Sequence, residues 1–181
     1  VQFTRPAGEG KVAPDLQFQF RIAAVACGLC SISYNGIAFS KEFGSRQRFH
    51  MILTDAEIES TPLLEENVCN GCKSCARACP LGAISEDEFD EIEICGKKFA
   101  VGKIEICRKK FTVGKIDYSK CKNCENGAVV NRFSPDSKPD RIAALCNRTC
   151  MCGLEERGAI TNVFENKFRY SEPWSIGNNN G

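Results

Sequence analysis

The sequence predicts an α+β fold of short helices and hairpins, and three features of its 181 residues support this. Four cysteines lie close together within residues 69–79 and are followed by Pro80. A segment near the N-terminus has apolar residues at helical spacing, and a tandem repeat over 92–115 alternates apolar and polar residues. With 43% hydrophobic and 26% charged residues, the composition is that of a folded protein with one or two domains.

The stretch that ends at Pro80 reads C-x2-C-x2-C-x3-C-P, with thiols at Cys69, Cys72, Cys75 and Cys79. This is the ligand run of bacterial ferredoxins, whose first three cysteines bind one cluster while the fourth binds the other cluster of a pair. Iron in such clusters requires soft, anionic sulfur ligands, which thiolates supply. The run therefore predicts a [4Fe–4S] cluster here and assigns Cys79 to a second one.

The downstream cysteines supply the remaining ligands, with one thiol more than a pair of clusters needs. The three-residue gap between Cys146 and Cys150 repeats the gap at the end of the first run, so Cys150 is taken as the crossing ligand. The assignment is Cys69, Cys72, Cys75 and Cys150 for cluster 1, and Cys79, Cys121, Cys124 and Cys146 for cluster 2, with Cys152 in reserve. Tetrahedral zinc on Cys121, Cys124, Cys146 and Cys150 is an alternative, although it leaves Cys79 without a cluster.

The chain before this run predicts an irregular arm, one buried helix and two strands. Residues 1–15 are rich in proline and glycine, which favours irregular structure. The expected elements are a helix through Phe18, Ile22, Val25 and Leu29 that ends near Gly28, a turn at Asn35 and Gly36, and strands at 37–39 and 48–54.

Other candidate ligands in this part are interpreted as structural. Cys27 and Cys30 form a C-x2-C pair, and we favour small buried residues over a further metal site. His50, the only histidine, is expected to be a hydrogen-bonded core or surface residue rather than a ligand. Arg46 and Arg48 are expected to form surface salt bridges rather than to hold an anionic cofactor.

Residues 92–103 and 104–115 are near-identical copies that differ at two positions. Each copy predicts a hairpin, in which Cys95 and Cys107 are strand residues rather than cluster ligands. A recent duplication and an error in the established sequence are both open explanations. The acidic residues 85–91 are expected to be a solvated connection rather than a docking face.

The C-terminal third predicts short helices around the downstream cysteines. Asp140 is expected to cap a helix over 141–145, and a short helix and turn are expected over 154–160. The aromatic tail, with Phe164 and Trp174, is expected to pack against the body, with only the last residues loose.

Residues 34–60, with an N-G…G-x-R-x-R…T-D pattern that leads into the ferredoxin run, resemble the C-terminal part of epoxyqueuosine reductases and reductive dehalogenase-like iron–sulfur proteins. The segment from Cys146 to Gly158, followed by 166–169, is similar to the closing segment of ferredoxin-type members. The resemblance covers about residues 22–170 and implies two [4Fe–4S] clusters that feed electrons to a partner site, a corrinoid in the characterised enzymes. Most of the family's N-terminal catalytic and corrinoid-binding region has no counterpart here, and no proton donor can be carried over.

We therefore expect a ferredoxin-like double-cluster module that transfers electrons. The expected domains are 1–62, an arm, helix and strands that are the remnant of a larger reductase-like domain; 63–170, a 2[4Fe–4S] ferredoxin-like domain with a hairpin insertion at 92–115; and 171–181, a tail. The alternatives are a C-terminal fragment of a corrinoid-dependent reductase and a structural zinc or iron–sulfur module. The chain itself does not support corrinoid binding, and an electron-transfer protein or subunit is favoured over an enzyme.

The expected partner is a redox protein or a larger oxidoreductase complex. The net charge of +1 gives no general attraction to nucleic acid, and no apolar run is long enough to span a membrane. Cluster assembly needs reduced thiols, so we expect a cytoplasmic protein. Because the sequence begins with Val1, we expect a processed chain or a piece of a longer one.

Overall fold

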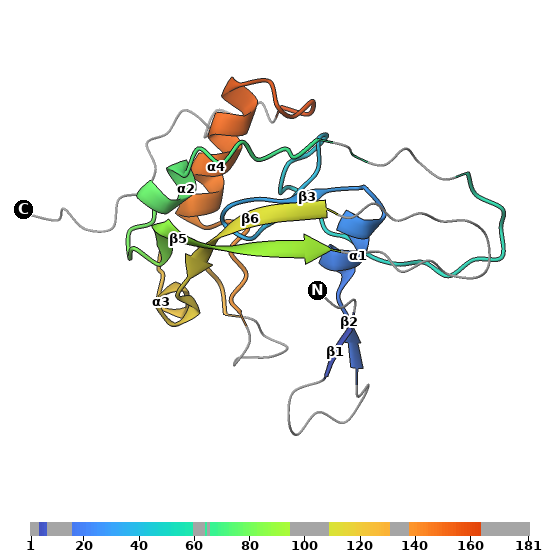
Figure 1. Cartoon of the computed structure of the whole chain (residues 1–181), viewed down its shortest axis with the longest axis horizontal. Helices are drawn as coiled ribbons and strands as arrows, with labels where there is room; N and C mark the ends of the chain where they lie inside the picture. The colour runs from blue at the N-terminus through green and yellow to red at the C-terminus, as the bar shows by residue number, and fades with distance from the viewer. Residues whose placement is uncertain are drawn as a thin grey trace, which may run out of the picture.

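The computed structural model describes residues 4–6, 16–59, 64, 66–94, 109–130 and 138–163. Short helices and two-stranded antiparallel sheets make up these residues, which confirms the predicted α+β class (Figure 1). In chain order the elements are β1 (Thr4–Pro6), β2 (Leu16–Phe18), α1 (Phe20–Ala26), β3 (Ser31–Ile32), β4 (Ala38–Phe39), α2 (Ser74–Arg77), β5 (Ile84–Ile94), β6 (Lys109–Ile116), α3 (Tyr118–Lys122) and α4 (Leu145–Glu156). None of the described helices could cross a membrane.

Strands β5 and β6 form the long hairpin on which the other elements are arranged. The sequence predicts one hairpin for each copy of the repeat, but this is wrong for the described strands: Ile92 of the first copy pairs with Phe111 of the second. Alternation determines which face of a strand is apolar, but it does not select the partner strand. Cys95 and Cys107 lie outside the described residues.

The acidic residues 85–91 belong to β5, so the predicted connection is a strand. The side chains from 86 to 91 are exposed, which agrees with the prediction that this segment is solvated. Glu88, for example, forms an ion pair of 2.8 Å with Lys115 of β6. Charged side chains can lie in this strand because one face of a two-stranded hairpin can remain exposed to water.

Two small cores lie toward opposite ends of this hairpin. At one end α1 packs on the hairpin, with Val25 and Ile94 only 1% exposed. Toward the other end α2 and α4 lie side by side, and Ile84 of β5 packs among cysteines of both helices (Figure 1). The burial of apolar side chains holds α1 to one end of the hairpin and the cysteine-bearing helices α2 and α4 to the other.

Helix α1 confirms the predicted buried helix, although it is shorter than expected. It ends at Ala26, and Gly28 follows with φ of 71°, a left-handed conformation that suits glycine after a helix. Phe18 lies instead in β2, which pairs with β1. The prediction of a wholly irregular arm is therefore wrong for residues 4–6, and residues 7–15 lie outside the described part.

The turn at Asn35 and Gly36 is confirmed, and it joins β3 to β4. The Asn35 side-chain oxygen accepts the backbone N–H of Ile37 at 3.1 Å, a local bond that stabilises such turns. The predicted strand over 48–54 is wrong, since these residues form no strand and Ile52 is 87% exposed. Alternation alone predicted it, but no neighbouring strand in the described structure pairs with it.

Helix α4 begins later and is longer than predicted. Asp140 Oδ1 accepts the N–H of Ile142 at 3.0 Å and forms a turn, so the predicted helix at 141–145 is wrong. The helix starts at Leu145, and the helix predicted at 154 is only its last turn before Gly158. The aromatic tail lies outside the described residues.

Candidate metal centre

The first cysteine run is a tight loop that leads into α2. Gly71 and Lys73 have φ of 72° and 58°, and these two left-handed residues curl the chain around the thiols. Cys75 lies within α2 and is 4% exposed, whereas Cys72 is exposed. The backbone N–H of Tyr34 points to Cys69 Sγ at 3.4 Å, so the β3–β4 turn contacts the loop.

Cys150 of α4 meets this loop. Burial raises the pKa of the Cys150 thiol, and the charges of Cys75, Cys69 and Cys72 raise it further. Burial likewise raises the pKa of Cys75 to about 12, again with contributions from Cys69 and Cys72. Cys69, Cys75 and Cys150 pack around the same small core, so these thiols lie close together, and a cation there would stabilise their thiolate forms.

The other four assigned cysteines line a single cavity. Its walls are Cys79, Cys121, Cys124 and Cys146 together with Pro80, Leu81, Ala83, Ile84, Ala128, Arg141, Ala144 and Leu145. Burial raises the pKa of Cys146 to about 11, and the charges of Cys79 and Cys121 add to this effect. The lining is largely apolar, and it buries Cys121 and Cys146 while Cys79 and Cys124 stay partly exposed; such apolar surroundings help to tune a metal cluster.

Local hydrogen bonds position the thiols of this cavity. The N–H of Ala83 donates to Cys79 Sγ at 3.2 Å. Asp117 is the N-cap of α3, where its carboxylate accepts the N–H of Ser119 at 3.0 Å and starts the helix that carries Cys121. N–H donors directed at sulfur are typical of iron–sulfur sites.

Both groups consist of thiols, the ligands that iron–sulfur clusters use. In the part of the chain that the structure describes, no three His, Cys, Asp or Glu side chains are gathered to hold one ion. The zinc alternative would need Cys121, Cys124, Cys146 and Cys150 around one centre, but Cys150 faces the first run instead. In a [4Fe–4S] cube each cysteine thiolate binds a different iron atom, so the four cysteine sulfurs lie farther apart than they would around a single metal ion.

Cys152 does not join either group. It follows Cys150 by two residues, which places it on nearly the opposite face of α4, whereas Cys146 and Cys150 are one turn apart and share a face. The Cys152 thiol is exposed and lies 3.3 Å from Glu156 Oε1.

The remaining candidates of the sequence analysis lie outside the cavity that Cys79, Cys121, Cys124 and Cys146 line. Cys30 is buried in the core beneath α1, as expected, whereas Cys27 is exposed. His50 is an exposed residue whose ring lies 5.8 Å from that of Phe20. Arg48 pairs with Asp140 at 2.6 Å, which agrees with the salt-bridge interpretation.

Arg46 likewise pairs with a carboxylate, that of Glu155 on α4. Glu155 is 5% exposed at its side chain, so this pair is more buried than the expected surface bridge. It attaches the loop after β4 to the helix that carries Cys146 and Cys150.

Sequence reasoning missed three residues that organise the site. The Tyr34 hydroxyl donates to Ser85 O at 3.0 Å, which ties the β3–β4 turn to β5. Asn147 of α4 donates to Ser45 Oγ at 2.7 Å, and Arg141 donates to Asn35 O at 2.9 Å. Each hydrogen bond joins residues that are far apart in the chain, so no local pattern in the sequence predicts it.

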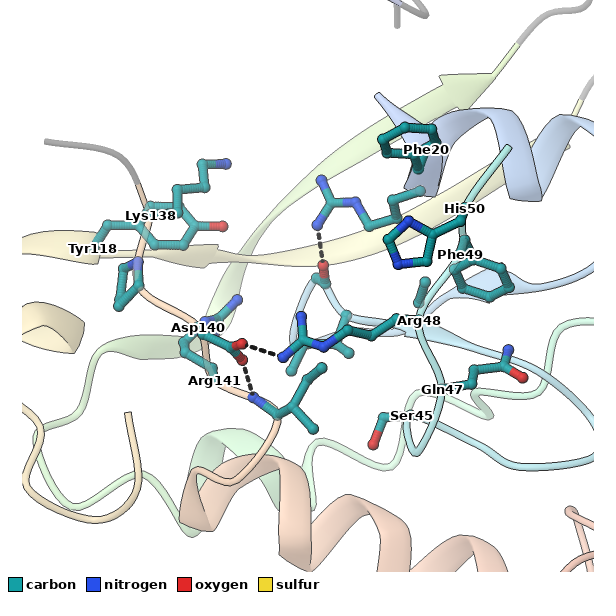
Figure 2. A pocket seen from close by; sticks show the side chains of 16 residues that line it. Phe20, Ser45, Gln47, Arg48, Phe49, His50, Tyr118, Lys138, Asp140 and Arg141 are labelled. Atoms are coloured by element: carbon teal, nitrogen blue, oxygen red, sulfur yellow. Dashed lines mark hydrogen bonds and ion pairs between the residues drawn. The ribbon is translucent and has the colours of Figure 1, made fainter. Parts of the chain in front are cut away.

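A larger cavity of about 410 Å³ lies on the other side of Arg141. Figure 2 shows Phe20, Phe49 and His50 on one side of it and Tyr118 and Lys138 on the opposite side. Its charged lining residues are Arg21, Arg48, Lys138, Arg141 and the single carboxylate Asp140. The lining is therefore basic and aromatic, which suits an anion that carries a ring.

Comparison with known proteins supports the iron–sulfur character of the chain. Residues 62–85 match the 4Fe-4S binding domain, so the chain contains a ferredoxin-type segment. The tetrachloroethene reductive dehalogenases of Desulfitobacterium hafniense and Dehalobacter restrictus are 37% identical to it over 68 residues. That alignment covers 36% of this chain but 12% of the length of each relative. No solved structure matches the chain.

Proposed function

We propose that this chain transfers electrons through two [4Fe–4S] clusters to or from a redox partner or partner domain. Two observations support the proposal: Cys79 lines one cavity together with Cys121, Cys124 and Cys146, and Cys150 packs around the same core as Cys69 and Cys75. Each group combines thiols of the first run with thiols from downstream, the pattern of two-cluster ferredoxins. No disulfide joins any of the eight assigned cysteines.

The two groups are close enough to form one electron path. The charge of Cys146, in the second group, contributes to the raised pKa of Cys75 in the first. Cys69, Cys75, Cys146 and Cys150 also pack around the same small core. Each cluster, when bound, would accept and release single electrons, and the protein would hold the two in adjacent apolar surroundings.

We further propose that the partner docks near Cys72. This thiol is exposed, while Cys75, Cys121 and Cys146 are buried, so the first cluster is the one nearer to solvent. Arg77 donates to Cys72 O at 2.8 Å and also pairs with Glu86 at 3.5 Å, so both charges lie at the surface beside the loop.

The ligand assignment predicts opposite results for two neighbouring cysteines of α4. Cys150→Ala should remove the fourth ligand of cluster 1 and lower the iron content, because the iron held by that thiolate loses its anchor. Cys152→Ala should retain full iron and an unchanged EPR spectrum, since its thiol faces away. Iron analysis of both variants, purified without oxygen, checks this, and the reverse pattern would make Cys152 the ligand.

Metal analysis and low-temperature EPR of the reduced chain test the function itself. We expect about eight iron atoms per chain and two interacting signals, as for a pair of [4Fe–4S] clusters. A protein that contains only zinc would contradict the proposal and favour a structural module. Because cluster assembly requires reduced thiols, we also propose that the chain works in the cytoplasm.

The corrinoid-dependent alternative receives no support from the larger cavity. That cavity, of about 410 Å³, has a basic and aromatic lining, and none of its features is specific to a corrinoid. The activity in the names of the relatives belongs to proteins that extend far beyond the matched segment.

A further inference from the structure

Arg141 is a buried arginine with one guanidinium nitrogen that lacks a partner. The residue is 7% exposed, and its Nη2 donates to Asn35 O at 2.9 Å. Its Cζ lies 5.3 Å from the centre of the Tyr118 ring. Among the described atoms, however, Nη1 has no hydrogen-bond acceptor although it is buried. A buried charged donor without an acceptor is unfavourable, so a function for this nitrogen is expected.

The surroundings of Arg141 indicate what that acceptor is. Arg141 lines the cavity formed by Cys79, Cys121, Cys124 and Cys146. Arg141 is the one cation among the residues that line this cavity, and it shares the cavity with Cys121 of α3 and Cys146 of α4.

We propose that Arg141 Nη1 donates a hydrogen bond to a sulfur of cluster 2 and thereby raises the reduction potential of that cluster alone. The inference rests on the proposed two-cluster function. Reduction adds negative charge to a site that four thiolates already make anionic, and a fixed guanidinium stabilises the reduced form more than the oxidised form. Cluster 2 would then accept electrons more readily than its apolar cavity alone would allow.

The bond to Asn35 makes Arg141 a positioning residue as well. It fixes the guanidinium from the β3–β4 turn, whose neighbouring residue Tyr34 donates to Cys69 Sγ in the first group. The same short turn therefore contacts one group through its own backbone and the other group through Arg141. We expect the turn to maintain the difference in electrostatic environment between the two clusters.

The test is an EPR-monitored redox titration of the full chain with Arg141→Gln. We expect the reduction equilibrium of one cluster to shift about tenfold toward the oxidised form, about 59 mV for a single electron, while the other cluster stays unchanged. Arg148→Gln is the matched control, because it removes the same charge from an exposed position on α4 between Cys146 and Cys150. Arg148→Gln should shift the reduction potential of either cluster much less than Arg141→Gln shifts that of cluster 2.

Two further measurements keep the test decisive. Arg141→Lys retains the charge but lacks the forked donors, so its shift should be smaller than that of the glutamine variant. In wild-type protein with 15N only in arginine side chains, pulsed EPR should detect a nitrogen coupling at a reduced cluster, and Arg141→Lys should remove it. This measurement decides the proposal even if the glutamine variant does not fold.

The outcomes separate this inference from the function on which it rests. Two intact clusters with potentials unchanged in Arg141→Gln, or a shift no larger than that of Arg148→Gln, would overturn the role of Arg141 alone. A wild-type spectrum without any arginine nitrogen coupling would do the same. Wild-type protein without iron–sulfur clusters would instead overturn the proposed function.

Discussion

Cys79→Ala should reduce the iron content from about eight to about four atoms per chain, because in the proposed assignment it removes a ligand of cluster 2 and leaves all four ligands of cluster 1. Cys79 belongs to the first run in the sequence, yet in the structure it lines the cavity of Cys121, Cys124 and Cys146. The interacting EPR signals of two reduced clusters should become the signal of one isolated cluster. Iron and sulfide analysis with EPR measures both effects.

Cys152→Ala serves as the control for this experiment, because its exposed thiol lies outside both groups. Full iron content in the Cys79 variant would show that the crossing assignment is wrong. Loss of cluster 1 with retention of cluster 2 would show that Cys79 completes the first group instead. Circular dichroism of both variants establishes that the fold persists.

Gly127→Ala should be among the most destabilising single substitutions in the chain. A Cβ at this position would lie 2.3 Å from the backbone oxygen of Ala143, and φ of 88° is unfavourable for any other residue. Neither backbone segment can move freely, since Leu145 N donates to Asn126 O at 3.0 Å next to this contact. We expect a loss of about 4 kcal/mol or more in the free energy of unfolding.

Gly158→Ala is the matched control for the steric part of this effect. Gly158 also has a positive φ, of 63°, but no described atom lies within 4 Å of the position that a Cβ would occupy there. It should cost about 1–2 kcal/mol, the penalty for a left-handed conformation alone. Denaturant titrations of the two variants side by side measure the difference, and equal costs would show that the close contact with Ala143 relaxes easily.

Gly127→Ala should also affect cluster 2 before it affects cluster 1. Gly127 lies between Cys124 and Ala128, which both line the second cavity, and the contact with Ala143 holds this loop against the start of α4. If the loop moves, Cys124 and Cys146 separate. Partial unfolding followed by EPR should therefore show the second cluster lost first.

The first ligand group was largely predictable because its chemistry is local. Cys69, Cys72 and Cys75 lie within one loop, and their spacing alone is typical of a single cube of iron and sulfide. The helical spacing of Ile22 and Val25 likewise predicted α1, because amphipathic periodicity is a property of the segment itself. The predicted turn at Asn35 and Gly36 was correct for the same reason.

The wrong predictions concern segments whose structure depends on pairing with a strand that is distant in the sequence. The repeat over 92–115 contains apolar alternation in both copies, and nothing in that pattern indicates that Ile92 pairs with Phe111. The strand predicted over 48–54 found no neighbouring strand among the described residues and left Ile52 exposed. Strand pairing depends on side chains that meet only after the chain has folded.

Four thiols at ferredoxin spacing over about a dozen residues already specify the ligand chemistry of a [4Fe–4S] cluster, because that chemistry is local. The distant groups that surround the sulfurs are visible only in the fold. Cys150 rather than the exposed Cys152 packs with Cys69 and Cys75, and Arg141 lies between the second cavity and the larger one. The position of each residue around the axis of α4 decides which face of the helix it lies on. These contacts form only when α4 packs against α2 and the central hairpin, because the residues concerned are far apart in the sequence.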